Sequence, residues 1–394
     1  MGSESRNRYL LKNTLIFTLG NIGSRMISFF LIPLYTNVLT TSQYGTVDLI
    51  TTISTVAGPM LTLNIAESVM RFGLDKDADK EKNTQCGSIV LLIAMIIGLV
   101  LIPICRCITE VSDYAMYVYF YVISLSASQL FLCDLRGKEL LLKYSLGNIL
   151  QTLMIAILNI TFLLVFKMET GGYLLAYIIA NFIVAIYAII AGKGYKAFSF
   201  HNIDRCKLKE MIRYSVVLIP NTFMWWIMNS SDRVMVTYMI GAAANGIYAV
   251  SYKLPTLVST LTGIFNQAWS YSAIREEGTS DETEYNNKMF KTLSAIAFMM
   301  GIGLLLLTKP FLGVYVADSY YDAWKYTPFL IIGCVYLTLG TFMATSYTVH
   351  KDSFGYLFSG SFGAAFNILL NFILIPVIGV YGAALACLLY TSDA

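Results

Sequence analysis

Charged side chains are scarce in this chain of 394 residues. They make up 13% of the sequence, whereas hydrophobic side chains make up 57%, and the mean hydropathy is +0.64. A soluble domain of this size needs much less apolar sequence to build its core. Runs of about 20 apolar residues, each long enough to cross a bilayer as a helix, recur along the whole chain. The composition therefore predicts an all-α polytopic membrane protein.

Residues that serve metal, nucleotide and proton chemistry are also few. The two histidines, His201 and His350, fall between apolar runs, and the chain contains no P-loop. The seven cysteines show no metal or redox spacing beyond one Cys105-x-Cys107 pair, and we interpret them as small buried residues. The net charge of +3 gives no case for binding nucleic acid. We therefore predict no metal, no cofactor and no catalytic residue, which means that the protein is not an enzyme.

The apolar runs predict twelve membrane-spanning helices. Their approximate ranges are 13–38, 46–66, 86–105, 114–133, 144–166, 172–192, 212–239, 245–268, 288–308, 326–349, 354–376 and 379–390. The first is too long for a signal peptide and lacks a cleavage pattern, so we expect it to stay in the protein. The last is short and no basic flank follows it, so we expect a truncated product with an incomplete final helix.

Basic residues alternate along the chain in a way that predicts its orientation. Twenty of the 27 Lys and Arg residues lie in the odd-numbered flanks, counted from the N-terminus, and only four lie in the other flanks. Cytoplasmic loops retain Lys and Arg, so the odd-numbered flanks and both termini are predicted to be cytoplasmic. A miscounted helix would invert this bias partway along the chain, and it never inverts. The charge pattern therefore supports the helix count.

The sequence repeats itself in two halves. The turn that ends in Gly45 resembles the turn that ends in Gly246, and the segment from Asn159 to Gly172 resembles the one from Asn371 to Gly382. Because each half begins and ends in the cytoplasm, the repeats are parallel, and transporters of this kind hold their substrate between the halves. The predicted domains are a six-helix lobe (1–192), a basic cytoplasmic linker (193–211) and a second, incomplete six-helix lobe (212–394).

Polar side chains recur at helical spacing on the first two predicted helices of each lobe. Helices that line a cavity need such stripes, although the same residues also hydrogen-bond neighbouring helices in membrane bundles. Asp232 directly precedes Arg233, but neighbours on a helix point about 100° apart and need not pair. The predicted polar lining comprises Asn21, Asp48, Thr52, Asn229, Asp232 and Gln267.

Three cations stand inside predicted spans: Arg25, Arg233 and Lys253. Hydrocarbon tolerates such residues only where they face protein or a watery cavity. Guanidinium and ammonium groups complement phosphate oxygens, so the cations predict an anionic ligand, most simply a phosphate or pyrophosphate. Two structural alternatives stay open: Arg25 pairs with Asp48 or Glu67, and Lys253 extends to the membrane surface.

Several short motifs, taken in order, resemble the polysaccharide-transporter family of the multidrug/oligosaccharidyl-lipid/polysaccharide flippase superfamily. They are LIFTLGN at 15–21, IPLYT at 32–36, QYG at 43–45, SDR at 231–233 and GIYAVSYK at 246–253. The resemblance covers essentially the whole chain. It implies two six-helix lobes around a central cavity, with Arg25 and the Asp232-Arg233 pair at positions where such transporters carry cavity charges and with a looser correspondence for Lys253.

The resemblance also implies a function. Such proteins are bacterial inner-membrane flippases for undecaprenyl-pyrophosphate-linked oligosaccharides, in O-antigen, capsule or exopolysaccharide synthesis, and they work by alternating access. Expected partners are this lipid-linked oligosaccharide, the bilayer and other polysaccharide-assembly membrane proteins. Two alternatives remain: a multidrug and toxin extrusion antiporter, for which Asp48 is the clear acidic candidate, and a membrane-bound glycan polymerase or ligase. The latter enzymes typically have a large external loop, whereas the longest loop here is predicted to be cytoplasmic.

Overall fold

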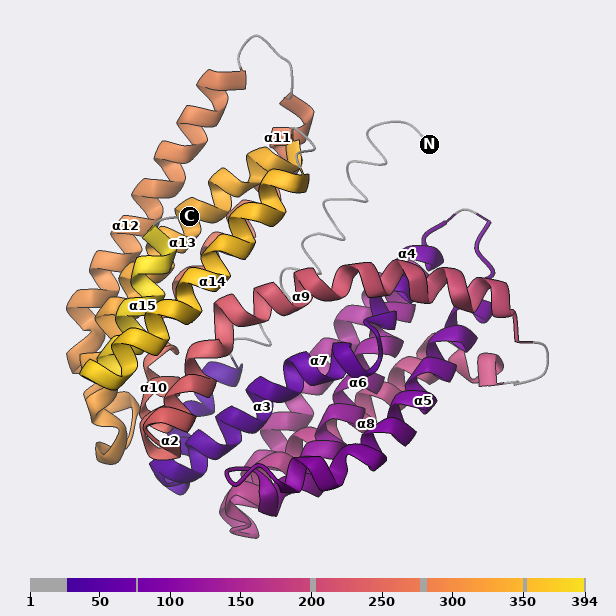
Figure 1. Ribbon diagram of the computed structural model, residues 1–394, viewed down its shortest axis with the longest axis horizontal. Helices are drawn as coiled ribbons and strands as arrows, with labels where there is room; N and C mark the ends of the chain where they lie inside the picture. Colours follow the sequence, from indigo (N-terminus) through magenta and orange to yellow (C-terminus); the bar gives the residue numbers. More distant parts are fainter. Residues whose placement is uncertain (1–26, 76, 199–202, 277–281, 350–352, 393–394) are drawn as a thin grey trace. The chain divides into compact units, whose positions relative to one another are not determined.

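The computed structural model describes residues 27–75, 77–198, 203–276, 282–349 and 353–392, and in this part of the chain every regular element is a helix (Figure 1). The α-helices are α2 (Ile32–Val38), α3 (Thr41–Leu61), α4 (Ile65–Gly73), α5 (Lys80–Arg106), α6 (Ala115–Gly137), α7 (Leu141–Asn159), α8 (Glu169–Ala191), α9 (Arg205–Met239), α10 (Ala242–Ser251), α11 (Pro255–Glu276), α12 (Glu282–Tyr315), α13 (Thr327–Val349), α14 (Ser353–Ile378) and α15 (Val380–Ser392). Shorter 3-10 and π elements are η1 (Ser112–Tyr114), η2 (Ile160–Val165), η3 (Gly194–Phe198) and η4 (Asp318–Lys325).

The predicted membrane spans coincide with these helices from the second span onward. Among the described residues, seven helical segments are long and apolar enough to cross a membrane, and α3 with α4 makes an eighth if the bent pair is one span. Two longer helices, α9 and α11, are absent from that set because polar residues interrupt their apolar runs. Most of the first predicted span, 13–26, lies outside the described residues. The prediction of an all-α polytopic membrane protein is confirmed.

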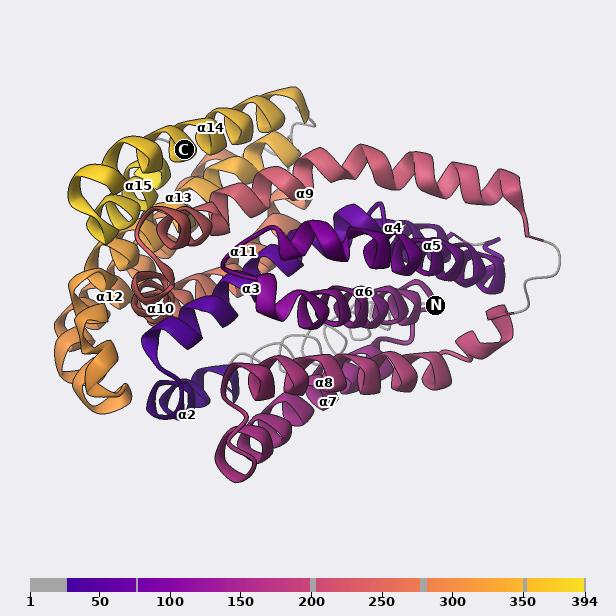
Figure 2. The ribbon, with the colours of Figure 1, turned by 60° about the horizontal axis from the view of Figure 1, so that its bottom comes forward.

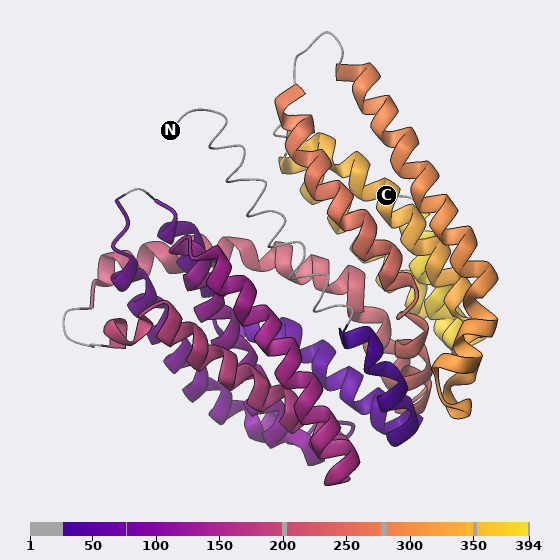
Figure 3. The ribbon, with the colours of Figure 1, turned by 180° about the vertical axis from the view of Figure 1, so that it is seen from behind.

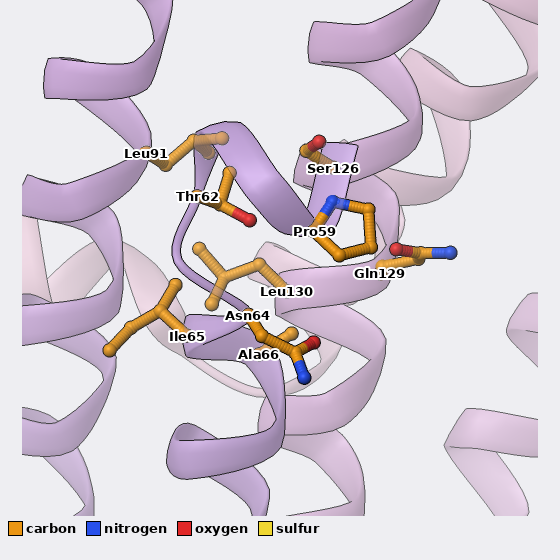
Figure 4. A pocket seen from close by; sticks show the side chains of 9 residues that line it. All are labelled: Pro59, Thr62, Asn64, Ile65, Ala66, Leu91, Ser126, Gln129 and Leu130. Atoms are coloured by element: carbon orange, nitrogen blue, oxygen red, sulfur yellow. The ribbon is translucent and has the colours of Figure 1, made fainter. Parts of the chain in front are cut away.

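The predicted second span is broken rather than continuous. A bend of 60° separates α3 from α4, and Leu63 and Asn64 at the bend adopt φ values of 52° and 54°. Pro59 in the last turn of α3 has no N–H, so the helical ladder is already weakened there. The bend lines a small cavity of about 10 Å³, roughly the space of one water molecule (Figure 4). The residues around it are Pro59, Thr62, Asn64, Ile65, Ala66, Leu91, Ser126, Gln129 and Leu130.

The predicted eighth span is also broken. Residues 252–254 form a turn between α10 and α11, and Pro255 opens α11. Proline suits the first position of a helix because its fixed φ is helical and its missing N–H would have no partner there. Lys253 therefore stands at the C-terminal end of α10 rather than inside a continuous helix. A cation at this end is stabilised by the partial negative charge of the last carbonyl groups.

The chain forms two compact units. One comprises residues up to 34 together with 50–223, and the other comprises 35–49 together with 224–394. In the first unit, α6 packs beside α8 (Figure 2), and its apolar core includes Cys86, Leu130, Leu135, Val184 and Ala188. These boundaries follow packing and differ from a division by repeats, so the lobes 1–192 and 212–394 stay a prediction.

The second unit is built on α10–α15 and the polar α9 segment after residue 223 (Figure 3). Its core combines Val236, Tyr248, Leu330, Ile375, Val380, Ala383 and Ala384. The short segment 35–49 belongs to this unit, and its attachment is specific: the Tyr320 hydroxyl donates to the carbonyl of Leu39 at 2.9 Å. Tyr44 packs edge-on against the same Tyr320 ring. This anchor holds the start of α3 in place.

The start of α3 crosses α10 at two glycines. A Cβ at Gly45 would collide with the carbonyl oxygen of Ala242, and a Cβ at Gly246 would collide with that of Thr41. Each helix thus presents a small residue four positions before its glycine, which is the pattern that lets two membrane helices approach closely. The two glycines that correspond in the sequence repeat therefore lie at one helix crossing, and this crossing positions the polar residues that follow.

Candidate functional site

Asp48 on α3 and Arg233 on α9 form a buried ion pair. Arg233 Nη1 donates to Asp48 Oδ1 at 3.2 Å, and the side chains are 8% (Asp48) and 19% (Arg233) exposed. The two residues are 185 positions apart in sequence but belong to the same compact unit. Removing one member of such a buried pair typically costs about 3–5 kcal/mol, because the other charge is left without compensation.

Asn245, on α10 between the crossing residues Ala242 and Gly246, holds the Asp48 carboxylate. Its Nδ2 donates to the carbonyl of Gly45 at 3.0 Å and to Asp48 Oδ2 at 3.3 Å. The Gly45 bond is possible because the glycine pair brings the two backbones together. The crossing thus fixes Asp48 through the neighbouring helix, one turn beyond Gly45 on α3.

Among the described residues, Asp232 makes no ion pair with the Arg233 guanidinium within 4.0 Å, in keeping with the separation of about 100° between helix neighbours. Its Oδ2 accepts hydrogen bonds from the hydroxyls of Tyr248 at 2.7 Å and Tyr252 at 2.6 Å. Its Oδ1 accepts the backbone N–H of Arg233 at 2.9 Å. Three hydrogen-bond donors thus satisfy the Asp232 carboxylate.

Tyr252 connects the two carboxylate sites. Its ring lies under the Arg233 guanidinium, with Cζ 4.8 Å from the ring centroid, while its hydroxyl binds Asp232. Cation–π contact of this kind contributes roughly 0.5–2 kcal/mol, with the larger values where water is excluded. Arg233 is therefore oriented by a carboxylate from α3 and an aromatic face from the turn after α10.

Lys253 follows Tyr252 directly and is half-buried. It lies within electrostatic range of both Asp48 and Arg233, attracted by the first and repelled by the second. Among the described residues, its ammonium has no ion pair within 4.0 Å. The structure thus brings together four of the predicted site residues, Asp48, Asp232, Arg233 and Lys253, within the second unit.

The remaining predicted residues are placed differently. Asn229 is exposed, and its side chain donates to the carbonyl of Trp225 on its own helix at 2.7 Å. Thr52 is buried on α3, one turn beyond Asp48. The side chain of Gln267 lies outside the described part of the structure, although its backbone belongs to α11. Asn21 and Arg25 lie outside the described residues altogether.

Three residues of the site were not predicted from sequence: Asn245, Tyr248 and Tyr252. Tyr248 and Tyr252 are four positions apart, a spacing that places both hydroxyls on one face of the chain as it leaves α10. That spacing is visible in the sequence, but buried tyrosines commonly serve only as core residues. Among the described residues, the cluster contains two carboxylates, Asp48 and Asp232, and two cations, Arg233 and Lys253. Within the described residues, no group of His, Cys, Asp and Glu side chains could hold a metal ion.

The fold and sequence were compared with known proteins. The model of the family described as polysaccharide biosynthesis protein matches residues 10–271. No curated protein matches the chain in sequence. Among solved structures, an outward-facing multidrug resistance MATE family transporter of the MOP superfamily aligns over 97% of this chain and 92% of its own, with 12% identity and a TM-score of 0.65.

Two further structures show the same fold. The Vibrio cholerae MATE transporter VcmN in its bent form aligns over 99% of this chain and 94% of its own, with 12% identity and a TM-score of 0.59. Lipid II flippase MurJ in an inward closed conformation aligns over 96% and 85%, with 13% identity and a TM-score of 0.67. The chain therefore belongs to the family of polysaccharide biosynthesis proteins and has the membrane fold shared by MATE transporters and the MurJ flippase.

Proposed function

We propose that this protein is a flippase for oligosaccharides linked to undecaprenyl pyrophosphate, in the bacterial inner membrane. The family match supports a role in polysaccharide biosynthesis, and the fold likeness to MurJ supports a lipid-linked substrate. The product would serve O-antigen, capsule or exopolysaccharide synthesis, alongside other polysaccharide-assembly membrane proteins. In this proposal the protein moves its substrate and changes no covalent bond.

One observation carries the proposal: Arg233 and Lys253 occupy one buried polar cluster in a membrane fold. A guanidinium held by one carboxylate oxygen, and an ammonium that makes no ion pair with any described residue, are suited to a phosphate-bearing head group. Asp48 is seven residues into α3, about 10 Å along the helix from its start. With the N-terminus cytoplasmic, this start faces the outside, so the cluster would lie nearer the outer leaflet.

The proposed cycle is alternating access by two six-helix lobes, 1–192 and 212–394, joined by the linker 193–211. Arg25, Arg233 and Lys253 neutralise the pyrophosphate while the polar residues of the first two helices of each lobe solvate the glycan. The lipid tail stays in the bilayer throughout. Since the sequence contains no P-loop, the energy comes from an ion gradient or from the gradient of the substrate itself.

Complementation tests this function. The protein is expressed in a strain that lacks its own flippase, and surface glycan is measured at matched protein level. We expect Arg233→Ala and Arg25→Ala each to reduce surface glycan at least about tenfold, because each removes a cation worth 1.4 kcal/mol or more to the bound phosphate. Normal glycan from both variants would rule out the pyrophosphate site.

A MATE-type cation antiporter is the second candidate, and one observation favours it. Asp48 and Asp232 are both buried carboxylates, which is the charge that a cationic drug requires. In this case Asp48→Asn and Asp232→Asn would abolish resistance to cationic drugs in a sensitive host, whereas Arg233→Ala would leave it intact. A flippase gives no such resistance, so drug susceptibility separates the two candidates.

A further inference from the structure

We propose that Asp48 is an internal counter-ion that the phosphate of the substrate displaces from Arg233, and that it thereby sets how tightly the site binds. The inference rests on the proposed function, since it takes the ligand to be a phosphate-bearing lipid. In this role Asp48 does more than line the site, because its carboxylate competes with the substrate for the Arg233 guanidinium.

The guanidinium of Arg233 has binding capacity that Asp48 leaves unused. The ion pair is a single contact, from Nη1 to Oδ1 at 3.2 Å, and within the described part of the chain the buried Nε has no hydrogen-bond partner. Tyr252 lies against the guanidinium, with Cζ 4.8 Å from the ring centroid, and this cation–π contact needs none of the N–H donors. A phosphate can take two parallel N–H bonds from a guanidinium, which is a stronger arrangement than a single contact. The substrate can therefore outcompete the carboxylate.

Asp48 keeps partners when Arg233 turns to a phosphate. Asn245 Nδ2 donates to its second oxygen at 3.3 Å, and Lys253 attracts it electrostatically. A carboxylate stranded in a buried site would be costly, and these two groups reduce that cost. The exchange of partners is therefore feasible without unfolding the crossing that holds Asp48.

Asp48 rather than Asp232 is the competitor. The Asp232 carboxylate accepts two tyrosine hydroxyls and the backbone N–H of Arg233. Among the described contacts, it makes no bond to the Arg233 guanidinium. Asp48 bonds the guanidinium directly. A phosphate that approaches Arg233 therefore meets the negative charge of Asp48 at close range, and like charges in a poorly solvated site repel strongly. Neutralising Asp48 should raise the affinity for an anionic lipid.

Binding of farnesyl pyrophosphate to the purified full chain in nanodiscs tests the inference. We expect Asp48→Asn, which keeps the shape and the contact with Asn245, to bind at least about tenfold more tightly than the wild type, the equivalent of 1.4 kcal/mol. Arg233→Gln should bind more weakly. The gain from Asp48→Asn should be smaller in the Arg233→Gln background, because there the carboxylate no longer withholds the Arg233 guanidinium from the phosphate. Asp134→Asn is the matched control, since Asp134 is another buried carboxylate, paired with Lys138 at 2.6 Å in the other unit.

The outcomes separate this inference from the proposed function. If Asp48→Asn binds equally or more weakly while Arg233→Gln still loses binding, the counter-ion role is wrong and the cation site stands. If neither Arg233→Gln nor Lys253→Gln changes binding, the proposed phosphate site itself fails. A gain in Asp134→Asn equal to that in Asp48→Asn would also overturn the inference, because any lost carboxylate would then suffice.

A measurement on the wild type covers the case in which Asp48→Asn does not fold. A hydrophobic carbodiimide modifies buried carboxyl groups faster when they are not held in a direct ion pair, and peptide mass spectrometry locates the product. Saturating farnesyl pyrophosphate should increase modification of Asp48 several-fold and leave that of Asp134 unchanged. Constant or reduced modification of Asp48 would overturn the displacement.

Discussion

Two phenol hydroxyls hold Asp232, and they offer the sharpest test at the scale of single residues. Tyr248 is fully buried, and its hydrogen bond ends on a carboxylate. Hydrogen bonds to charged groups contribute about 1.5–3 kcal/mol. We expect Tyr248→Phe and Tyr252→Phe each to lower the thermal unfolding midpoint of the purified protein by several degrees, an effect that dye-based melting in detergent detects.

The control for the tyrosines is Tyr195→Phe. Tyr195 is 54% exposed and lies far along the chain from this cluster, so its loss should leave the midpoint unchanged. If Tyr248→Phe melts like Tyr195→Phe, Asp232 does not depend on its phenol donors.

At the scale of single residues, the sequence predicted the charged residues of the site but only some of the pairs that they form. Arg233 and Lys253 stood out because cations are rare within membrane spans. The partner of Arg233 could not be predicted, since Asp48 comes from a segment 185 positions earlier and reaches it through a helix crossing. Arg25, the third cation predicted from sequence, lies outside the described residues, so its role stays a prediction.

At the scale of elements, the crossing of α3 and α10 can be tested by substituting its two glycines. Gly45→Ala places a methyl group against the carbonyl of Ala242 and pushes the two helices apart, which also breaks the bond from Asn245 to the carbonyl of Gly45. We expect Gly45→Ala or Gly246→Ala to lower the unfolding midpoint and surface glycan. The double variant should be little worse than either one, because a crossing already opened has room for the second methyl.

Gly263→Ala is the matched control for the crossing. Gly263 also lies inside a helix, α11, and a Cβ there would meet nothing within 4 Å. Alanine favours a helix over glycine by about 0.5–1 kcal/mol, so this variant should be neutral or slightly more stable. Full additivity of Gly45→Ala and Gly246→Ala would show that the two glycines act at separate places.

The helices themselves could be predicted more readily than their breaks. Apolar length alone located the spans, because a bilayer demands it. The bend after Pro59 depends on two left-handed residues, Leu63 and Asn64, and only Asn is a usual choice for that conformation. The break before Pro255 has a clearer signal, since proline commonly opens a helix. That signal would have placed Lys253 at a helix end.

At the scale of the whole chain, two native cysteines test the predicted orientation. Cys107 lies in a flank predicted to be external and Cys206 in the predicted cytoplasmic linker, and both are exposed. In spheroplasts, a membrane-impermeant maleimide should label Cys107 and spare Cys206, and permeabilisation should expose Cys206. Cys86 is buried and serves as the unlabelled internal control.

Single variants identify the labelled site. Cys107→Ser should remove the signal from intact spheroplasts, and Cys206→Ser should remove the additional signal after permeabilisation. Labelling of Cys206 before permeabilisation would invert the orientation, and it would move the charge cluster toward the inner leaflet.

At the glycine crossing, different residues determine the distance between the helices and the chemistry of the site. Backbone atoms of α3 and α10 meet there because the two glycines have no side chains, and of the charged residues only Asp48 reaches across, through its bond to Asn245. Substitutions among the charged residues can therefore alter which head group is bound while the distance between the helices is retained. A designer who wished to redirect this protein to another lipid-linked cargo could change Asp48, Arg233 and Lys253 and leave Gly45 and Gly246 untouched.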